Sequence, residues 1–356
     1  MARVFAFVSN RGGSGKSTLV SQLGPAIALA NPGAKVLVLD FSIQQDTSVI
    51  LLGGTQQPDT FQPGIRSKGA EVIANLPPQQ RALGLVRAIM TPPQKPSFWR
   101  GMVSTSAQDA PLDFEKYCVQ PSIVHPTGRA PANLFVAAGG PELYNFEPIT
   151  QAISLASKMR EYFARLSNTI ILIDTDAELS ERVSSLIGIA SAQSIAVVLS
   201  SAWNDYERLH ADKANGFFEC LRYLTHNDQG FDGKVMHVIF NNVVKRINDP
   251  STLAESLCIP FTPPADNRSS MEDIVTHLYS VCANRESNYK MYFSDPGAFK
   301  SATEFAQTYV TGVSAIPTTV LQQSLSLGQS IMMQRSSAPQ EAASSQLTHV
   351  AKRFSH

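Results

Sequence analysis

The chain has 356 residues, of which 43% are hydrophobic and 16% are charged, so it can bury a core in one large or two small domains. Lys+Arg and Asp+Glu both total 29, and this zero net charge argues against a protein that binds nucleic acid through bulk charge. The four cysteines lack C-x-x-C spacing, which favours reduced core thiols over a disulfide or zinc framework. The sequence contains neither a signal-peptide pattern nor an apolar run near the ~20 residues that cross a bilayer, so we expect a cytoplasmic protein.

The first elements form a strand, loop, helix and strand in that order. Residues 3–8 are a short apolar run that ends in a glycine-rich loop, as in a buried parallel strand. Apolar residues then recur at helical spacing up to residue 30, although Pro25 is expected to kink this helix or shift its boundary. Residues 35–40 read as a second buried strand, which completes a right-handed βαβ unit.

Further alternation follows after residue 130. Strands are expected within 133–140, 169–174, 192–200 and 234–241, and helices within 147–166 and 203–224. This order predicts a doubly wound α/β fold with a mostly parallel sheet flanked by helices. Its ligand site is expected at the carboxyl ends of the strands.

Two regions break the pattern. Residues 52–130 are rich in Pro, Gly and Gln, and they predict an irregular insertion with one helix near 70–90. Residues 316–335 read as a partner-binding helix or a core helix, and 336–356 as a flexible linker with a short amphipathic tail. One domain is therefore expected over residues 1–315.

The stretch SNRGGSGKST, residues 9–18, predicts a phosphate-binding loop. It has Asn10 where a standard P-loop has glycine, but it keeps the G-K-S-T ending between a strand and a helix. The motif assigns Lys16 to the β- and γ-phosphates and the Ser17 hydroxyl to Mg²⁺. A glycine-rich turn that merely starts a helix is the competing interpretation.

The segment RGGSGKST resembles the deviant Walker A loop, K-G-G-x-G-K-[ST], of the ParA/MinD family of P-loop ATPases. The resemblance implies ATP and Mg²⁺ as cofactors, a nucleotide-sandwich homodimer, and Arg11 in place of the lysine that reaches the partner's phosphates. Arginine keeps the charge and can contact two phosphate oxygens at once. A solvated surface arginine is the alternative. The nucleotide-binding residues implied are Gly12, Gly13, Ser14, Gly15, Lys16, Ser17 and Thr18.

The segment DFSIQQDTS resembles the family's D-x-D-P-Q switch. Asp40 matches the first acid and is implied as a metal and catalytic residue, while Gln44 matches the glutamine and Ser48 a common threonine. Ser42 stands where the family has the aspartate that positions the attacking water. A serine hydroxyl is a far poorer base, so slow hydrolysis or none is expected.

The segment ILIDTD resembles the Walker B strand, which makes Asp174 the acid behind the Mg²⁺ water shell. Asp176 is either a partial replacement for the acid missing at position 42 or an ordinary loop acid. Asn241 and Asn242 are both candidates for the adenine contact. Residues 259–267 fall where the family closes over the base, with Asp266 as a contributor.

The resemblance implies an ATP-dependent dimerising switch for intracellular positioning or partitioning, read by a cargo adaptor or activating protein. Nonspecific DNA is one candidate surface, although the nearest basic residues are sparse: Lys245, Arg246, Lys290 and Lys300. Peripheral membrane contact through residues 346–356 is another. The alternatives are a non-hydrolysing ATP-bound scaffold and a P-loop transferase that acts on a small molecule.

Overall fold

The computed structural model describes residues 1–9, 12–56, 66–90, 112–121, 130–143, 149–176, 183–200, 203–209, 217–228, 234–243, 268–283, 301–314, 320–322, 325, 331 and 338–355. These residues contain a seven-stranded sheet in which every paired strand is parallel to its neighbour, in the order β3-β2-β4-β1-β5-β6-β7. The strands are β1 (Arg3–Val8), β2 (Lys35–Asp40), β3 (Leu134–Ala137), β4 (Thr169–Asp174), β5 (Ser194–Leu199), β6 (Val235–Val243) and β7 (Val310–Ser314).

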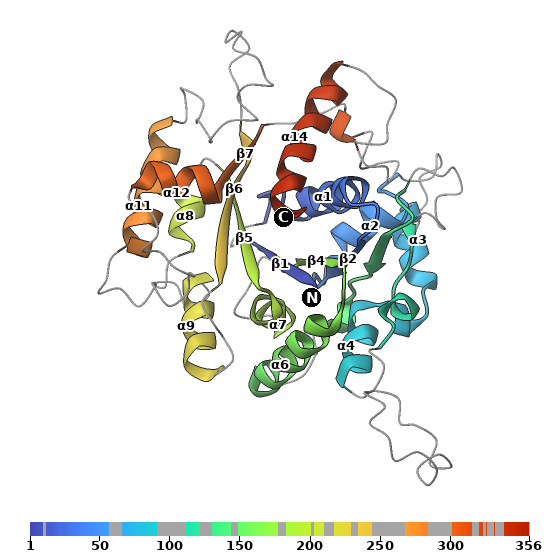
Figure 1. The fold of residues 1–356 in the computed structure, drawn as a ribbon. Coiled ribbons are helices and arrows are strands. Elements are labelled where there is room, and N and C mark those ends of the chain that lie inside the picture. Colours follow the sequence, from blue (N-terminus) through green and yellow to red (C-terminus); the bar gives the residue numbers. More distant parts are fainter. Residues whose placement is uncertain are drawn as a thin grey trace.

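Helices cover both faces of this sheet (Figure 1). They are α1 (Lys16–Ala30), α2 (Asp46–Leu52), α3 (Lys68–Asn75), α4 (Ala82–Met90), α6 (Ile149–Arg165), α7 (Val183–Ser191), α8 (Trp203–Glu207), α9 (Phe217–Asn227), α11 (Arg268–Ala283), α12 (Ala302–Tyr309) and α14 (Ala338–Ser355). Single 3-10 turns occur at Pro78–Gln80, Phe114–Tyr117 and Pro141–Leu143. The α/β fold predicted from the sequence is confirmed.

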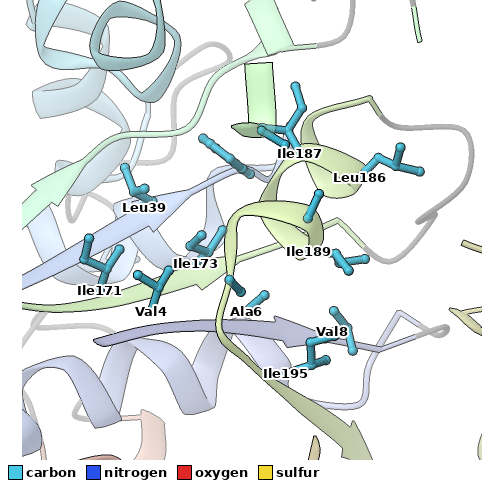
Figure 2. Packing of buried hydrophobic residues seen from close by; sticks show 14 of the residues in the cluster. Val4, Ala6, Val8, Leu39, Ile171, Ile173, Leu186, Ile187, Ile189 and Ile195 are labelled. Carbon is cyan, nitrogen blue, oxygen red and sulfur yellow. The ribbon is translucent and has the colours of Figure 1, made fainter. Parts of the chain in front are cut away.

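Successive side chains of each strand enter opposite cores, because side chains alternate across a sheet. Figure 2 shows one core, where Val4, Ala6 and Val8 of β1 lie with residues of the neighbouring strands against α7. The intervening Phe5 and Phe7 belong to the other core, beside α1 and α14. Strands buried on both faces explain why their sequences are continuous apolar runs.

Helix α1 continues through Pro25, which is buried within it, so the helix is not ended there. The strand β7 had no counterpart among the sequence expectations. Its sequence, VTGVS, is short and contains a glycine, and it acquires strand geometry by pairing with β6. Within the expected insertion, α3 and α4 stand where one helix was expected, separated by the Pro78–Gln80 turn.

The expectation of a flexible linker and free tail at 336–356 is wrong for residues 338–355. They form helix α14, which packs beside α1 (Figure 1). Its apolar residues lie in the core rather than in solvent: Ala343, Leu347, Val350, Ala351 and Phe354. Since burial of this face against the rest of the domain stabilises the helix, the low-complexity composition of residues 338–346 was misleading. The face that was assigned to membrane contact is therefore occupied by the protein itself.

Candidate functional site

The predicted phosphate loop, residues 12–18, lies between the carboxyl end of β1 and the first turn of α1. Gly13 and Gly15 have φ angles of 87° and 75°, in the left-handed region that favours glycine. A Cβ atom on Gly15 would lie only 2.5 Å from Asn241 Nδ2. The loop backbone thus depends on glycine at these two positions, and it leads directly into the positive end of a helix.

A cavity of about 310 Å³ opens over this loop. Residues 12–18 form its floor, and its walls come from the ends of β2 and β4 and from α2. The wall residues that carry polar side chains are Ser9, Ser42, Gln44, Asp46, Thr55, Thr175 and Asp176. The site therefore lies at the carboxyl ends of the parallel strands, as expected for a doubly wound sheet.

Lys16 is the buried cation of this cavity. Its ammonium group donates to Asp174 Oδ1 and to the carbonyl oxygen of Thr175. The Lys16 side chain is only 6% exposed and the Asp174 side chain 0%, so each charge depends on the other. An anionic ligand in the cavity would meet a lysine already held in position.

Asp40 is fully buried next to Asp174, to which it is paired in register across β2 and β4. Its oxygens accept from Ser42 N at 3.0 Å, Ser48 N at 2.9 Å and Ser48 Oγ at 2.6 Å. Burial, followed by the charge of Asp174, raises the pKa of Asp40 to about 7. Ionising two adjacent buried carboxyl groups costs free energy, because both are desolvated and repel each other, unless a cation lies nearby.

These residues fit a magnesium site that is completed by phosphate oxygens. Mg²⁺ is held in nucleotide sites by one or two carboxylates together with phosphates and water. The half-buried Ser17 lines the cavity, and the buried Asp174, paired in register with Asp40, contacts Lys16, which also lines it. Among the described residues no three acid, His or Cys side chains form a cluster that would hold a metal by itself. The protein offers part of a coordination shell, as a nucleotide site requires.

Ser42 lies at the cavity with its side chain turned to its own loop. It is 5% exposed, and its hydroxyl accepts from the Gln44 N–H at 3.2 Å. Asp176 lines the same cavity and accepts from the Ile43 N–H at 3.4 Å. The acid that is missing at position 42 therefore has an acidic neighbour on the adjoining strand end.

Sequence reasoning missed two residues that support the site, Thr47 and Asp46, and gave a third, Ser48, no role. The Thr47 hydroxyl lies 2.6 Å from Asp174 Oδ2 and 3.1 Å from the Ser17 carbonyl, so it connects α2 to the phosphate loop. Asp46 lines the cavity, and burial with the nearby Asp174 raises its pKa. Ser48 had been noted only as a match to a family threonine, yet it holds Asp40. The sequence did contain a signal for them: these polar residues begin a helix shortly after a strand that ends in an acid.

Asn241 lies on the far side of the loop, where its Nδ2 donates to the Ser14 carbonyl at 2.9 Å. It lines a second cavity of about 180 Å³. Arg11, the segment 259–267 with Asp266, and the basic residues at 245, 246, 290 and 300 lie outside the described residues, as does the side chain of Asn242. In the stretch 316–335, the described Leu321 and Leu325 each line one of the two cavities.

No protein-family model matches the sequence, and no curated protein is significantly similar to it. Solved structures do share its fold. The pNOB8 ParA structure has a TM-score of 0.54 and 12% identity, covering 99% of this chain and 98% of its own. A putative plasmid partition protein of Borrelia burgdorferi B31 has a TM-score of 0.53 and 10% identity, covering 99% of both chains. Cyanothece McdA has a TM-score of 0.50 and 14% identity, covering 93% and 92%.

The chain therefore shares the α/β fold of these structures, and the loop predicted to bind phosphate lies between β1 and α1. No helix among the described residues has the length and hydropathy needed to cross a membrane.

Proposed function

We propose that this protein is an ATP-dependent dimerising switch of ParA/MinD type that acts in intracellular positioning or partitioning. The observation that carries the proposal is the cavity over residues 12–18, which is lined by Lys16. The ammonium group of Lys16 contacts the buried Asp174, which is paired in register with Asp40. The fold shared with ParA and McdA supports it, and the Borrelia relative in that comparison is bound to AMPPNP.

In this proposal residues 12–18 hold the phosphates, and Ser17, Asp40 and Asp174 face the Mg²⁺ ion. The bound ion would neutralise charge on the phosphate oxygens. Lys16 exchanges its contact with Asp174 for a phosphate oxygen, and Thr47 keeps a hydrogen-bond donor on Asp174 when the lysine leaves. Asn241 fixes the loop from behind through the Ser14 carbonyl.

Dimerisation is proposed to depend on Arg11. The residue immediately precedes the glycines of the loop, and a guanidinium there can contact the phosphates bound by a second copy of the chain. Each triphosphate then belongs to both subunits, and its hydrolysis loosens the dimer. An activating protein or cargo adaptor would set the timing of this change.

We expect slow ATP hydrolysis, because the Ser42 hydroxyl supplies no negative charge and already accepts a hydrogen bond from the Gln44 N–H. This observation also favours the second candidate, a non-hydrolysing ATP-bound scaffold. As a working surface, nonspecific DNA is supported by a solved structure of pNOB8 ParA bound to nonspecific DNA. Membrane contact through the C-terminus is not proposed, because α14 buries its apolar face.

Analytical ultracentrifugation with and without Mg²⁺–ATP tests the switch. Wild type should shift from monomer to dimer on addition of ATP. Lys16→Ala should bind no ATP and remain monomeric, whereas Arg11→Ala should bind ATP without dimerising. Arg87→Ala, an exposed position on α4, serves as the matched control and should behave as wild type. An ATP-loaded wild type that stays monomeric would contradict the proposal.

Measuring the rate of phosphate release from ATP distinguishes the hydrolysing switch from the non-hydrolysing scaffold. Ser42→Asp restores an acid at the cavity, and positioned acid–base catalysis contributes about 10²–10⁴-fold. We expect a slow wild-type rate and a rise of about 10²-fold in the variant. A wild type with no turnover that Ser42→Asp activates would favour the scaffold. If wild type hydrolyses ATP fast and Ser42→Asp does not raise the rate, Ser42 does not limit hydrolysis.

A further inference from the structure

Helix α2 connects the candidate site to the expected insertion, residues 52–130. Its first turn holds both buried acids. The Thr47 hydroxyl donates to Asp174 Oδ2 at 2.6 Å. Ser48 donates to Asp40 Oδ2 twice, from its hydroxyl at 2.6 Å and from its backbone N–H at 2.9 Å. A displacement of this turn therefore moves hydrogen-bond donors away from the two carboxyl groups that are proposed to face Mg²⁺.

Helix α3 of the insertion meets α2 at a glycine (Figure 1). A Cβ atom on Gly69 would lie 2.8 Å from the carbonyl carbon of Val49, the residue directly after Ser48, and closer still to its oxygen. The contact therefore requires glycine, which lets two backbones approach closely. The Val49 carbonyl also accepts from the Gly54 N–H at 2.9 Å, and the Gly54 carbonyl accepts from the Gly69 N–H at 3.0 Å. These contacts fix the start of α3 to the residue next to Ser48.

Helix α3 is itself anchored at both ends. The Ser67 hydroxyl caps its first turn by accepting from the Ala70 N–H at 3.4 Å, and the Arg81 guanidinium donates to the Ile73 carbonyl at 3.0 Å. The Ile73 side chain is 2% exposed and lies in the same core as Leu51 of α2. Because close-packed interiors transmit strain, the position of α3 determines that of α2.

We propose that α3 positions the Mg²⁺ site, with Gly69 as the residue that sets the place of Val49 and hence of the first turn of α2. This inference rests on the proposed function, and it gives the insertion a role that the sequence did not indicate. Hydrogen-bond partners of metal-binding groups typically contribute about 10–100-fold to metal affinity, and Thr47 and Ser48 are such partners in the proposed site.

Occupancy of the site and packing of α3 on α2 then stabilise each other, because coupling between two equilibria is reciprocal. Mg²⁺–ATP should slow amide hydrogen exchange at Gly54 and Gly69, the two donors of the backbone contact. ATP in excess EDTA should slow it less, because the phosphates then engage the loop without a metal ion that fixes the two acids.

Calorimetric titration of the full chain with ATP, in Mg²⁺ and in excess EDTA, tests the assignment. Gly69→Ala should weaken binding of Mg²⁺–ATP about tenfold, at the low end of the range above, and leave binding of metal-free ATP unchanged. Gly84→Ala on α4 is the matched control, because its Cβ atom would lie 2.5 Å from the Pro78 carbonyl oxygen, a close contact within the insertion that does not involve α2. It should bind ATP as wild type does in both conditions.

The inference is overturned if Gly69→Ala binds Mg²⁺–ATP as tightly as Gly84→Ala does. Equal loss with and without the metal would also overturn it, because the effect would then lie in the loop. So would wild-type hydrogen exchange at Gly54 and Gly69 that Mg²⁺–ATP leaves unchanged.

Failure of the proposed function looks different: wild type would not bind ATP, or Lys16→Ala would bind it as wild type does. If Gly69→Ala does not fold, Gly53→Ala takes its place, because its Cβ atom would lie 2.8 Å from the Gly69 nitrogen and press on the same contact less severely. If metal-free ATP binds too weakly to measure, the affinity for Mg²⁺–ATP relative to Gly84→Ala and the hydrogen exchange of wild type still decide the question.

Discussion

Helices α1 and α14 lie side by side on one face of the sheet and border the same cavity (Figure 1). Their sequences differ in how clearly they predict a helix. The start of α1 follows a loop whose glycines adopt left-handed angles, a requirement that a short motif can express. Residues 338–346 of α14 are mostly Ala, Ser, Gln and Glu, without a local signature. The comparison teaches that a backbone requirement can be read locally, whereas burial of a weakly apolar helix depends on the surface that receives it.

Contacts at the C-terminal end of α14 fix it to β1, to α12 and to the residue that follows α1. Phe354 packs edge-on against Phe5 of β1, with ring centroids 4.9 Å apart. The Arg353 guanidinium donates to the Thr308 carbonyl at 3.1 Å, and Asn31 after α1 donates to the Ser355 hydroxyl at 2.7 Å. These contacts make α14 a structural part of the domain.

Loss of the Phe354 ring should produce the largest change in stability. Removing a buried Phe side chain typically costs about 3–5 kcal/mol, so Phe354→Ala should lower the free energy of unfolding in urea by roughly that amount. Lys352→Ala, at an exposed neighbouring position, is the control and should change it little. A Phe354→Ala protein as stable as the control would break the comparison, because α14 would then contribute nothing to the fold.

Acid should loosen the same region through His237 of β6. Burial, and then the charge of Arg353, lowers the pKa of His237 from 6.5 to about 4. The unfolded chain therefore binds this proton more readily, and stability present above pH 6.5 is lost as the pH falls toward 4. The whole shift is worth about 3 kcal/mol.

Urea unfolding at pH 7 and pH 4.5 measures this loss. Wild type should lose more stability than His237→Gln, with each protein compared with itself at the two pH values. His226→Gln, at an exposed position on α9, should keep the wild-type pH dependence. If wild type and His237→Gln lose the same amount, His237 is not the group that titrates.

A smaller effect is expected at the phosphate loop, where Thr47 connects α2 to Asp174. Thr47→Val keeps the shape but removes a hydroxyl donor from a buried carboxylate, a contact worth about 1.5–3 kcal/mol. We expect unfolding free energy to fall by ~2 kcal/mol and ATP binding to weaken. The control is Thr225→Val, whose hydroxyl donates to the Leu221 carbonyl of its own helix. If both variants lose the same free energy of unfolding, the contact with Asp174 contributes no more than an ordinary hydrogen bond within a helix.

Part of the site was readable before the structure. Residues 12–18, Asp40 and Asp174 were expected at the carboxyl ends of strands. Residues 12–18 line one cavity, and the buried Asp174 contacts Lys16 of this loop and is paired with Asp40. The roles of these residues toward a nucleotide remain predictions, as does the contact of Arg11 with a second subunit. Thr47 and Asp46 were not singled out, because a polar residue on a short helix has no distinctive spacing.

The sequence by itself determined the parallel α/β sheet and the phosphate loop. Strands buried on both faces must be continuous apolar runs, and a loop with left-handed angles must contain glycine. Only the tertiary structure decided that residues 338–355 are a core helix and that this helix packs beside α1. These contacts join segments more than 300 residues apart, and the free energy that fixes them comes from burial against a partner surface that neither segment encodes alone.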